Sequence, residues 1–136
     1  MSSLWRTAPL GPVREQPQFL NAVAQIDVHD DAAPRALLAQ LLAVESQLGR
    51  DRAHEITQGA RAIDLDLLLW GQLVMDDPGP PRLLLPHPRL YARAFALAPL
   101  VEIAGDDLLI PGALGGRAAD LLAAALRDPA QTIEKM

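Results

Sequence analysis

Two aspartates stand two positions apart in an otherwise mostly apolar run, and this pair restricts how the chain can fold. The run covers residues 59–70 and places its carboxylates at Asp64 and Asp66. Because side chains alternate between the two faces of a β-strand, we expect a strand over residues 62–70 with both carboxylates on one face. The Leu-Leu-Leu-Trp sequence that follows indicates a central strand of a sheet.

The carboxylate pair predicts a metal site. Two carboxylates held side by side repel each other, and burying them without a partner is costly. A hard divalent cation relieves this repulsion, and Mg²⁺ held by one or two carboxylates plus substrate phosphates has this form. Arg61 lies three residues before Asp64, where it could meet such a phosphate. We therefore predict phosphoryl-type chemistry, the alternative being a half-exposed strand with a solvated acidic face.

Length and composition predict one domain spanning residues 1–136, with a frayed tail over residues 128–136. The chain has no cysteine, no apolar run long enough to cross a bilayer and no signal-peptide pattern, so we expect a cytoplasmic protein. Its net charge of −5 argues against nucleic acid and anionic membranes as partners.

Arginine supplies eleven of the twelve cationic side chains. Its planar fork binds phosphate through two hydrogen bonds, and arginines beside a metal-bound phosphate are expected in phosphoryl transfer. Arg50, Arg52 and Arg61 flank one glycine-containing loop and are our candidates. A GC-rich genome explains much of the overall bias, and a solvated basic loop is the alternative for these three.

Hydrophobic spacing predicts helices and strands in mixed order. A helix is expected after Asp30 or Asp31, with Pro34 in its first turn and Gly49 just beyond its end. A second helix over residues 89–104 should break or kink at Pro99. The other expected elements are strands at 2–7, 19–29, 73–75 and 108–110, a turn at 71, a loop at 76–81, an extended 83–85 segment and a helix that follows Gly115 and Gly116 and runs through Arg127. Such a mixture predicts an α+β sandwich.

Two weaker features indicate a ligand. His87 lies between two prolines, before the helix that carries Arg93, and is a candidate for a phosphate or ribose contact. Asn21 follows Phe19 closely, and an asparagine beside aromatic rings such as Phe19 and Phe95 can hydrogen-bond the edge of a flat heterocycle. A structural histidine and core aromatic residues are the alternatives.

Together these motifs resemble the 6-hydroxymethyl-7,8-dihydropterin pyrophosphokinase family of folate biosynthesis. The matching stretches follow the family order at residues 7–12, 16–21, 45, 48–52, 59–66, 86–88 and 93–95. The resemblance implies a ferredoxin-like α+β sandwich with a mostly antiparallel sheet. It also implies transfer of the pyrophosphoryl group of ATP to the pterin hydroxymethyl group with release of AMP. ATP and the dihydropterin are then the partners, and the oligomeric state stays open.

The resemblance also implies roles for single residues. Asp64 and Asp66 would hold two Mg²⁺ ions and act in catalysis with Arg50 and Arg61. The implied ATP contacts are Glu45, Arg52, Arg61, Leu67, Arg82, His87 and Arg93. The implied pterin contacts are Thr7, Pro9, Leu10, Phe19, Asn21 and Phe95.

Two departures from the family pattern bear on these expectations. Ala60 stands where the family has proline, which predicts a looser loop around Arg61. The match begins inside the family domain, so we expect its first strand, glycine-containing loop and first helix to be missing. The hypotheses are an active pyrophosphokinase, a catalytically impaired remnant that binds pterin or nucleotide, and an unrelated Mg²⁺-dependent nucleotide hydrolase.

Overall fold

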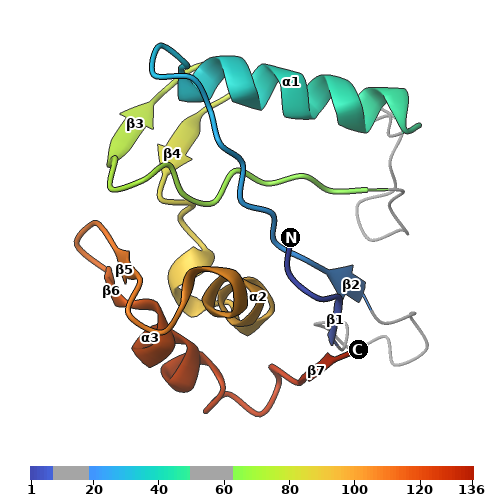
Figure 1. The fold of residues 1–136 in the computed structure, drawn as a ribbon, viewed down its shortest axis with the longest axis vertical. Helices are drawn as coiled ribbons and strands as arrows, with labels where there is room; N and C mark the ends of the chain where they lie inside the picture. Colours follow the sequence, from blue (N-terminus) through green and yellow to red (C-terminus); the bar gives the residue numbers. More distant parts are fainter. Residues whose placement is uncertain (8–18, 50–62) are drawn as a thin grey trace.

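The computed structural model describes residues 1–7, 19–49 and 63–136 (Figure 1). These residues form three antiparallel sheets and three α-helices, joined by turns and loops. The helices are α1 (Pro34–Gln47), α2 (Ala94–Ala104) and α3 (Ala118–Ala125), with a 3₁₀ turn η1 (Leu90–Ala92) before α2. The strands are β1 (Trp5–Thr7), β2 (Phe19–Asn21), β3 (Met75–Asp77), β4 (Leu83–Leu85), β5 (Leu109–Ile110), β6 (Gly116–Arg117) and β7 (Ile133–Lys135). The predicted α+β class is confirmed.

The largest sheet has the strand order β2-β1-β7, and both pairings are antiparallel. Trp5 lies opposite Asn21 on one side and opposite Lys135 on the other. The prediction of a frayed tail is therefore wrong for residues 133–135, which form an edge strand. Its ladder to β1 and the packing of Ile133 against the core hold this segment in place.

Helix α1 ends as predicted at its C-terminus, but it does not begin at the predicted N-cap. Gly49 follows the C-cap Leu48 with φ of 94°, a left-handed conformation that glycine adopts without strain. The N-cap is Ala33, not Asp30 or Asp31. Those aspartates lie in a separate turn, and the fixed φ of Pro34 sets the start of the helix instead.

Residues 63–70 are extended but form no strand, so the predicted strand is wrong over its described part. The predicted alternation is present, because Asp64 and Asp66 are exposed while Leu65 and Leu67 are half-buried. A strand also requires a hydrogen-bonded neighbour, and this segment runs beneath α1 without a ladder to any described strand (Figure 1). The local pattern thus predicted the orientation of the side chains but not the pairing.

Three further predicted elements have different extents. The strand expected over residues 19–29 ends at Asn21, because Ile26 and Val28 are exposed and contribute nothing to the core. The strand expected at 73–75 is β3, two residues later, and it pairs with β4 across a loop shorter than expected. The helical region at 89–104 comprises η1 and α2, and α2 continues through Pro99.

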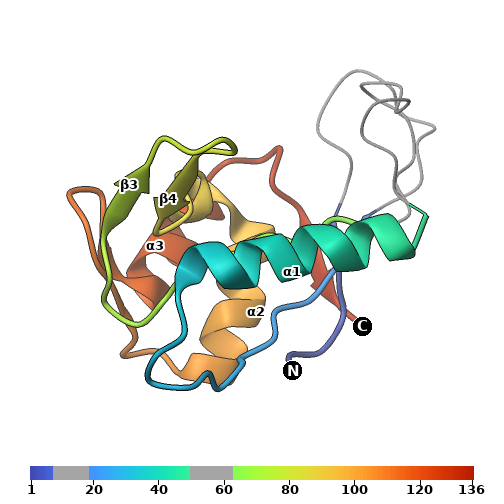
Figure 2. The same ribbon diagram turned by 90° about the horizontal axis from the view of Figure 1, so that it is seen from above.

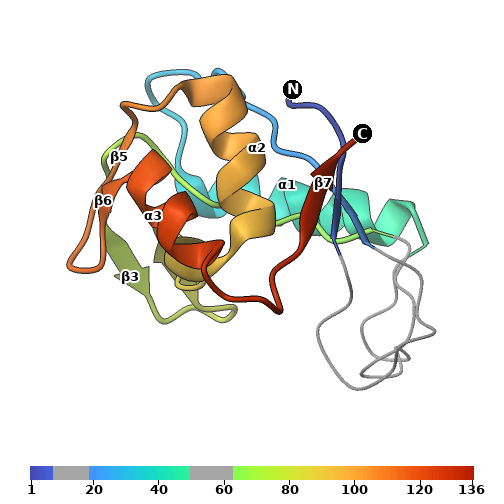
Figure 3. The ribbon, with the colours of Figure 1, turned by 90° about the horizontal axis from the view of Figure 1, so that it is seen from below.

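The hydrophobic core is built around α2. Leu97 and Leu100 of α2 are buried together with Leu90 and Ile110, and α2 packs on α3, β1 and β2. Helices α2 and α3 lie side by side in Figure 3, whereas α1 forms an outer layer nearest the viewer in Figure 2. Among the described helices, none has the combination of length and apolarity that a bilayer crossing requires.

Candidate functional site

Two hydrogen bonds hold the acidic segment in position. The backbone N–H of Leu65 donates to Oε2 of Glu45 on α1, with an N–O distance of 2.6 Å. The backbone N–H of His87 donates to the carbonyl oxygen of Leu68 at 2.8 Å. Asp66 lies between these two anchors, so α1 and the segment after β4 together fix its place.

The two aspartates repel each other across this segment. Although the Asp66 side chain is exposed at the surface, the protein around its carboxylate partly desolvates it and raises its pKa, and the negative charge of Asp64 raises it further. The charges of His87 and Arg93 lower this pKa, and the charge of Glu45 raises it. The structure thus brings Asp64, Asp66, His87 and Arg93 into one electrostatic neighbourhood.

The donor set of this neighbourhood suits a hard divalent cation that is shared with a ligand. Within residues 1–7, 19–49 and 63–136, no cluster of three or more His, Cys, Asp or Glu side chains could hold a metal ion by itself. Mg²⁺ is usually bound by one or two carboxylates, waters and substrate phosphates instead of an all-protein cage. Two carboxylates that repel each other, as Asp64 and Asp66 do, fit this arrangement.

The imidazole of His87 has a defined role as a donor. Burial lowers its pKa, with the positive charges of Arg93 and Arg89 adding to the effect and Asp66 opposing it. The ring is therefore neutral at neutral pH. Its Nδ1 accepts a hydrogen bond from the backbone N–H of Arg89 at 3.2 Å, which leaves the proton on Nε2. Nε2–H is a suitable donor for a phosphate or hydroxyl oxygen.

Arg93 stands at the N-cap of α2, where the chain turns from η1 into the helix. Its guanidinium lies 5.3 Å from the centre of the Phe95 ring, within the range of a cation–π contact. Arg93, a predicted ATP contact, and Phe95, a predicted pterin contact, therefore touch each other.

Arg82 lies directly before β4 and forms a two-pronged ion pair with Asp76 of β3. The Nε–Oδ1 and Nη2–Oδ2 distances are 3.0 Å and 2.8 Å. Asp76 was not predicted as a site residue, because residues 76–81 were expected to be a loop. The signal was present, since an Asp and an Arg on either side of a proline-rich turn are placed to meet across a hairpin.

The described pterin candidates lie mainly on β1 and β2. Thr7 is opposite Phe19 in the ladder, and the Nδ2 of Asn21 donates to Oγ1 of Thr7 at 3.4 Å. Phe95 belongs to α2, which packs against both strands. The candidates Pro9, Leu10, Arg50, Arg52 and Arg61, together with Ala60, lie outside the described residues.

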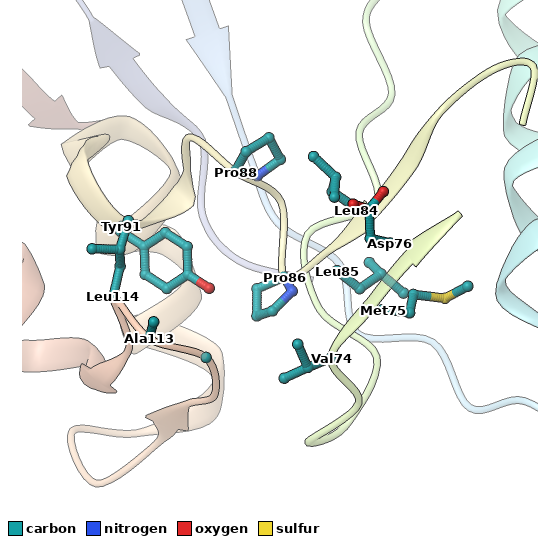
Figure 4. A pocket seen from close by; sticks show the side chains of 11 residues that line it. Val74, Met75, Asp76, Leu84, Leu85, Pro86, Pro88, Tyr91, Ala113 and Leu114 are labelled. Atoms are coloured by element: carbon teal, nitrogen blue, oxygen red, sulfur yellow. The ribbon is translucent and has the colours of Figure 1, made fainter. Parts of the chain in front are cut away.

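A pocket of about 410 Å³ lies between the β3–β4 hairpin and the loop before β6 (Figure 4). Its lining is mainly apolar, and Asp76 is its one charged residue. The lining residues are Val74, Met75, Asp76, Leu84, Leu85, Pro86, Pro88, Tyr91, Gly112, Ala113 and Leu114. None of them was predicted as a site residue, and the pocket lacks the convergent polar groups of a small-molecule site.

Comparison with known proteins identifies a family that this chain matches. A family model for 7,8-dihydro-6-hydroxymethylpterin-pyrophosphokinase (HPPK) matches residues 1–105. The chain is 41% identical over 136 residues to the 2-amino-4-hydroxy-6-hydroxymethyldihydropteridine pyrophosphokinase of Pseudomonas aeruginosa, covering all of this chain and 75% of that protein. It is 39% identical over 103 residues to the Bacillus subtilis protein of the same name, covering 76% of this chain and 57% of the relative.

A plant protein shows the same similarity within a longer chain. The mitochondrial folate synthesis bifunctional protein of Arabidopsis thaliana is 38% identical over 105 residues, which is 77% of this chain and 18% of that protein. The chain therefore spans between about a fifth and three quarters of the length of these three relatives.

Proposed function

The chain belongs to the 7,8-dihydro-6-hydroxymethylpterin-pyrophosphokinase family, and we propose from this premise that it transfers pyrophosphate from ATP to 6-hydroxymethyl-7,8-dihydropterin in folate biosynthesis. The pterin hydroxyl oxygen forms a bond to the β-phosphorus of ATP, the bond between that phosphorus and the α–β bridging oxygen breaks, and AMP leaves. The hydroxyl proton is released in the same reaction. The relatives named as pyrophosphokinases do not favour the impaired-remnant alternative.

The observation that carries this proposal is the anchored acidic pair facing His87 and Arg93. Asp64 and Asp66 would hold Mg²⁺, and we propose two ions there. When bound, Mg²⁺ neutralises negative charge on the phosphate oxygens. The Nε2–H of His87 and the guanidinium of Arg93 are positioned as donors to the triphosphate. Such positioning and charge neutralisation are the protein's main tasks in phosphoryl transfer.

The remaining ATP contacts follow from the family match, residue by residue. We propose that Arg50 and Arg61 stabilise the transferred group and that Arg52 binds the phosphates. Arg82, held by Asp76, and Leu67, on the same segment as the acidic pair, complete the nucleotide side.

The pterin would lie against the β1–β2 pair. Asn21 can present its amide to the edge of a flat heterocycle, and its bond to Thr7 fixes the amide's orientation. Phe19 and Phe95 would supply ring contacts, with Pro9 and Leu10 closing the pocket. We also propose that the α+β arrangement is ferredoxin-like.

Product analysis tests this function. The purified chain is incubated with ATP, Mg²⁺ and the dihydropterin, and AMP and pterin pyrophosphate are quantified. We expect both products only when all three components are present, and we expect Asp66→Asn to abolish their formation. Asp107→Asn changes a side chain that is 98% exposed and serves as the matched control. ATP loss without pterin would instead support a nucleotide hydrolase, and folded protein without any product would overturn the proposal.

A further inference from the structure

Glu45 is buried in a way that calls for an explanation. It is 2% exposed, and among the described residues no other charged side chain is buried. Moving a carboxylate out of water is costly unless hydrogen bonds or opposite charges compensate. A glutamate at a helical position that leucine could fill therefore indicates a specific task.

A hydrogen bond between Glu45 and the acidic segment points to that task. Its Oε2 accepts from the backbone N–H of Leu65, the residue between Asp64 and Asp66, at 2.6 Å. A bond between an ionised acceptor and a backbone N–H is short and strong compared with a neutral one. Residues 63–70 have no ladder to any described strand. This bond therefore fixes the backbone at the centre of the acidic pair, as a ladder would in a strand.

The charge and position of Glu45 argue against direct contact with phosphate. A carboxylate repels a triphosphate, and this one is covered by protein with its oxygen directed at a backbone amide. We propose that Glu45 is a positioning residue: by fixing the Leu65 backbone it presents the Asp64 and Asp66 carboxylates together to a divalent cation. This inference rests on the proposed function only for the identity of that cation.

Three substitutions of Glu45 distinguish the effect of its hydrogen-bond acceptor from the effect of its charge. Glu45→Gln keeps an oxygen at the same reach without the charge, Glu45→Asp keeps the charge but is one methylene shorter, and Glu45→Leu removes the acceptor. Gln40→Leu, at an exposed position of the same helix, is the matched control. The probe is Mn²⁺ alone, titrated into each folded protein and followed by electron paramagnetic resonance. The amide proton shift of Leu65 is recorded by NMR.

We expect Glu45→Leu and Glu45→Asp to weaken Mn²⁺ binding by about 10-fold or more, as is usual when the support of a metal ligand is lost. Glu45→Gln and Gln40→Leu should stay near the wild type. The Leu65 amide proton should lie downfield in the wild type and move upfield in the Leu and Asp variants only. If Glu45→Leu does not fold, Glu45→Asp provides the same comparison.

Equal Mn²⁺ affinity in the wild type and both weakened variants would overturn the proposal, as would an unchanged Leu65 shift or a wild type that binds no Mn²⁺. A rise in the KM for ATP with unchanged Mn²⁺ binding would assign Glu45 to the nucleotide instead. The binding assay contains neither ATP nor pterin. A wild type that binds Mn²⁺ as expected but forms no AMP would therefore contradict the proposed function alone.

Discussion

Asp64 and Asp66 lie on an irregular extended segment, whereas Asp76 and Asp77 lie on the regular strand β3 of the neighbouring hairpin. In the first pair, burial and mutual repulsion raise the pKa of Asp66. In the second pair, hydrogen bonds lower both values, from Arg82 to Asp76 and from Arg35 to Asp77. Two pairs of the same residue type, about ten positions apart, thus have opposite electrostatic surroundings.

Under the proposed function, this difference distinguishes a ligand site from a structural support. The hairpin neutralises its own aspartates with nearby arginines, so it gains nothing electrostatically from an added cation. An incoming cation would stabilise the ionised form of Asp66, which burial and the charge of Asp64 disfavour. Sites that perform chemistry are often less stable than their surroundings in this way.

Removing the first pair should have the largest effect. The double variant Asp64→Asn/Asp66→Asn is expected to lower kcat by about 10³-fold or more, since it removes the charges that hold the metal and the phosphates. AMP formation at saturating substrates is the measurement, with circular dichroism to verify folding. Asp77→Asn is the matched change in the hairpin and should retain most of kcat. Comparable losses in the two proteins would contradict the distinction between the pairs.

The second prediction concerns the hairpin's own contribution to the nucleotide site. Asp76→Asn breaks the two-pronged pair that orients Arg82. Because the pair is largely exposed, we expect a modest rise of about 3- to 10-fold in the KM for ATP, with kcat nearly unchanged. Asp120→Asn, which removes an exposed partner of Arg117, is the control. A fall in kcat without a change in KM would show that Asp76 acts on the chemical step.

These two aspartate pairs also show how far the sequence could predict the site. The alternation around Asp64 and Asp66 correctly placed both on one face. His87 and Arg93 were predicted as ligand contacts, and their charges act on Asp66. The missing ladder could not be predicted, because pairing depends on segments distant in the sequence. The burial of Glu45 could not be predicted either, since a glutamate on an amphipathic helix is usually solvated.

A third prediction tests what holds the hairpin on α1. Arg35 donates to Asp77 at 2.6 Å and to the carbonyl oxygen of Pro81 at 2.8 Å. Arg35→Gln should lower the free energy of unfolding, because an ion pair and one hydrogen bond to a backbone carbonyl are lost. Urea unfolding provides the measurement, and Arg127→Gln, at an exposed position, should be neutral. If Arg35→Gln left the free energy of unfolding unchanged, the contacts of Arg35 would not be what holds the β3–β4 hairpin on α1.

The smallest expected effect is a difference in pH dependence between the two pairs. The pKa of Asp66 is raised above its ordinary value of 3.8, so the folded state binds more protons than the unfolded chain between these two values. Stability then falls as the pH rises through this window, and Asp66→Asn should make the metal-free protein more stable at neutral pH. That gain should disappear below the ordinary value, where Asp66 is protonated in both states.

Asp77 should show the opposite sign, because its pKa is lowered, mainly by the hydrogen bond from Arg35. Its contribution to stability is present above the ordinary value of 3.8 and is lost as the pH falls through the lowered one. Asp77→Asn should therefore be less stable than the wild type at neutral pH and converge with it in acid. Urea unfolding of the wild type and both variants over this pH range measures the two differences. If they had the same sign, the electrostatic contrast between the segment and the hairpin would be wrong, even if the aspartates still differed in activity.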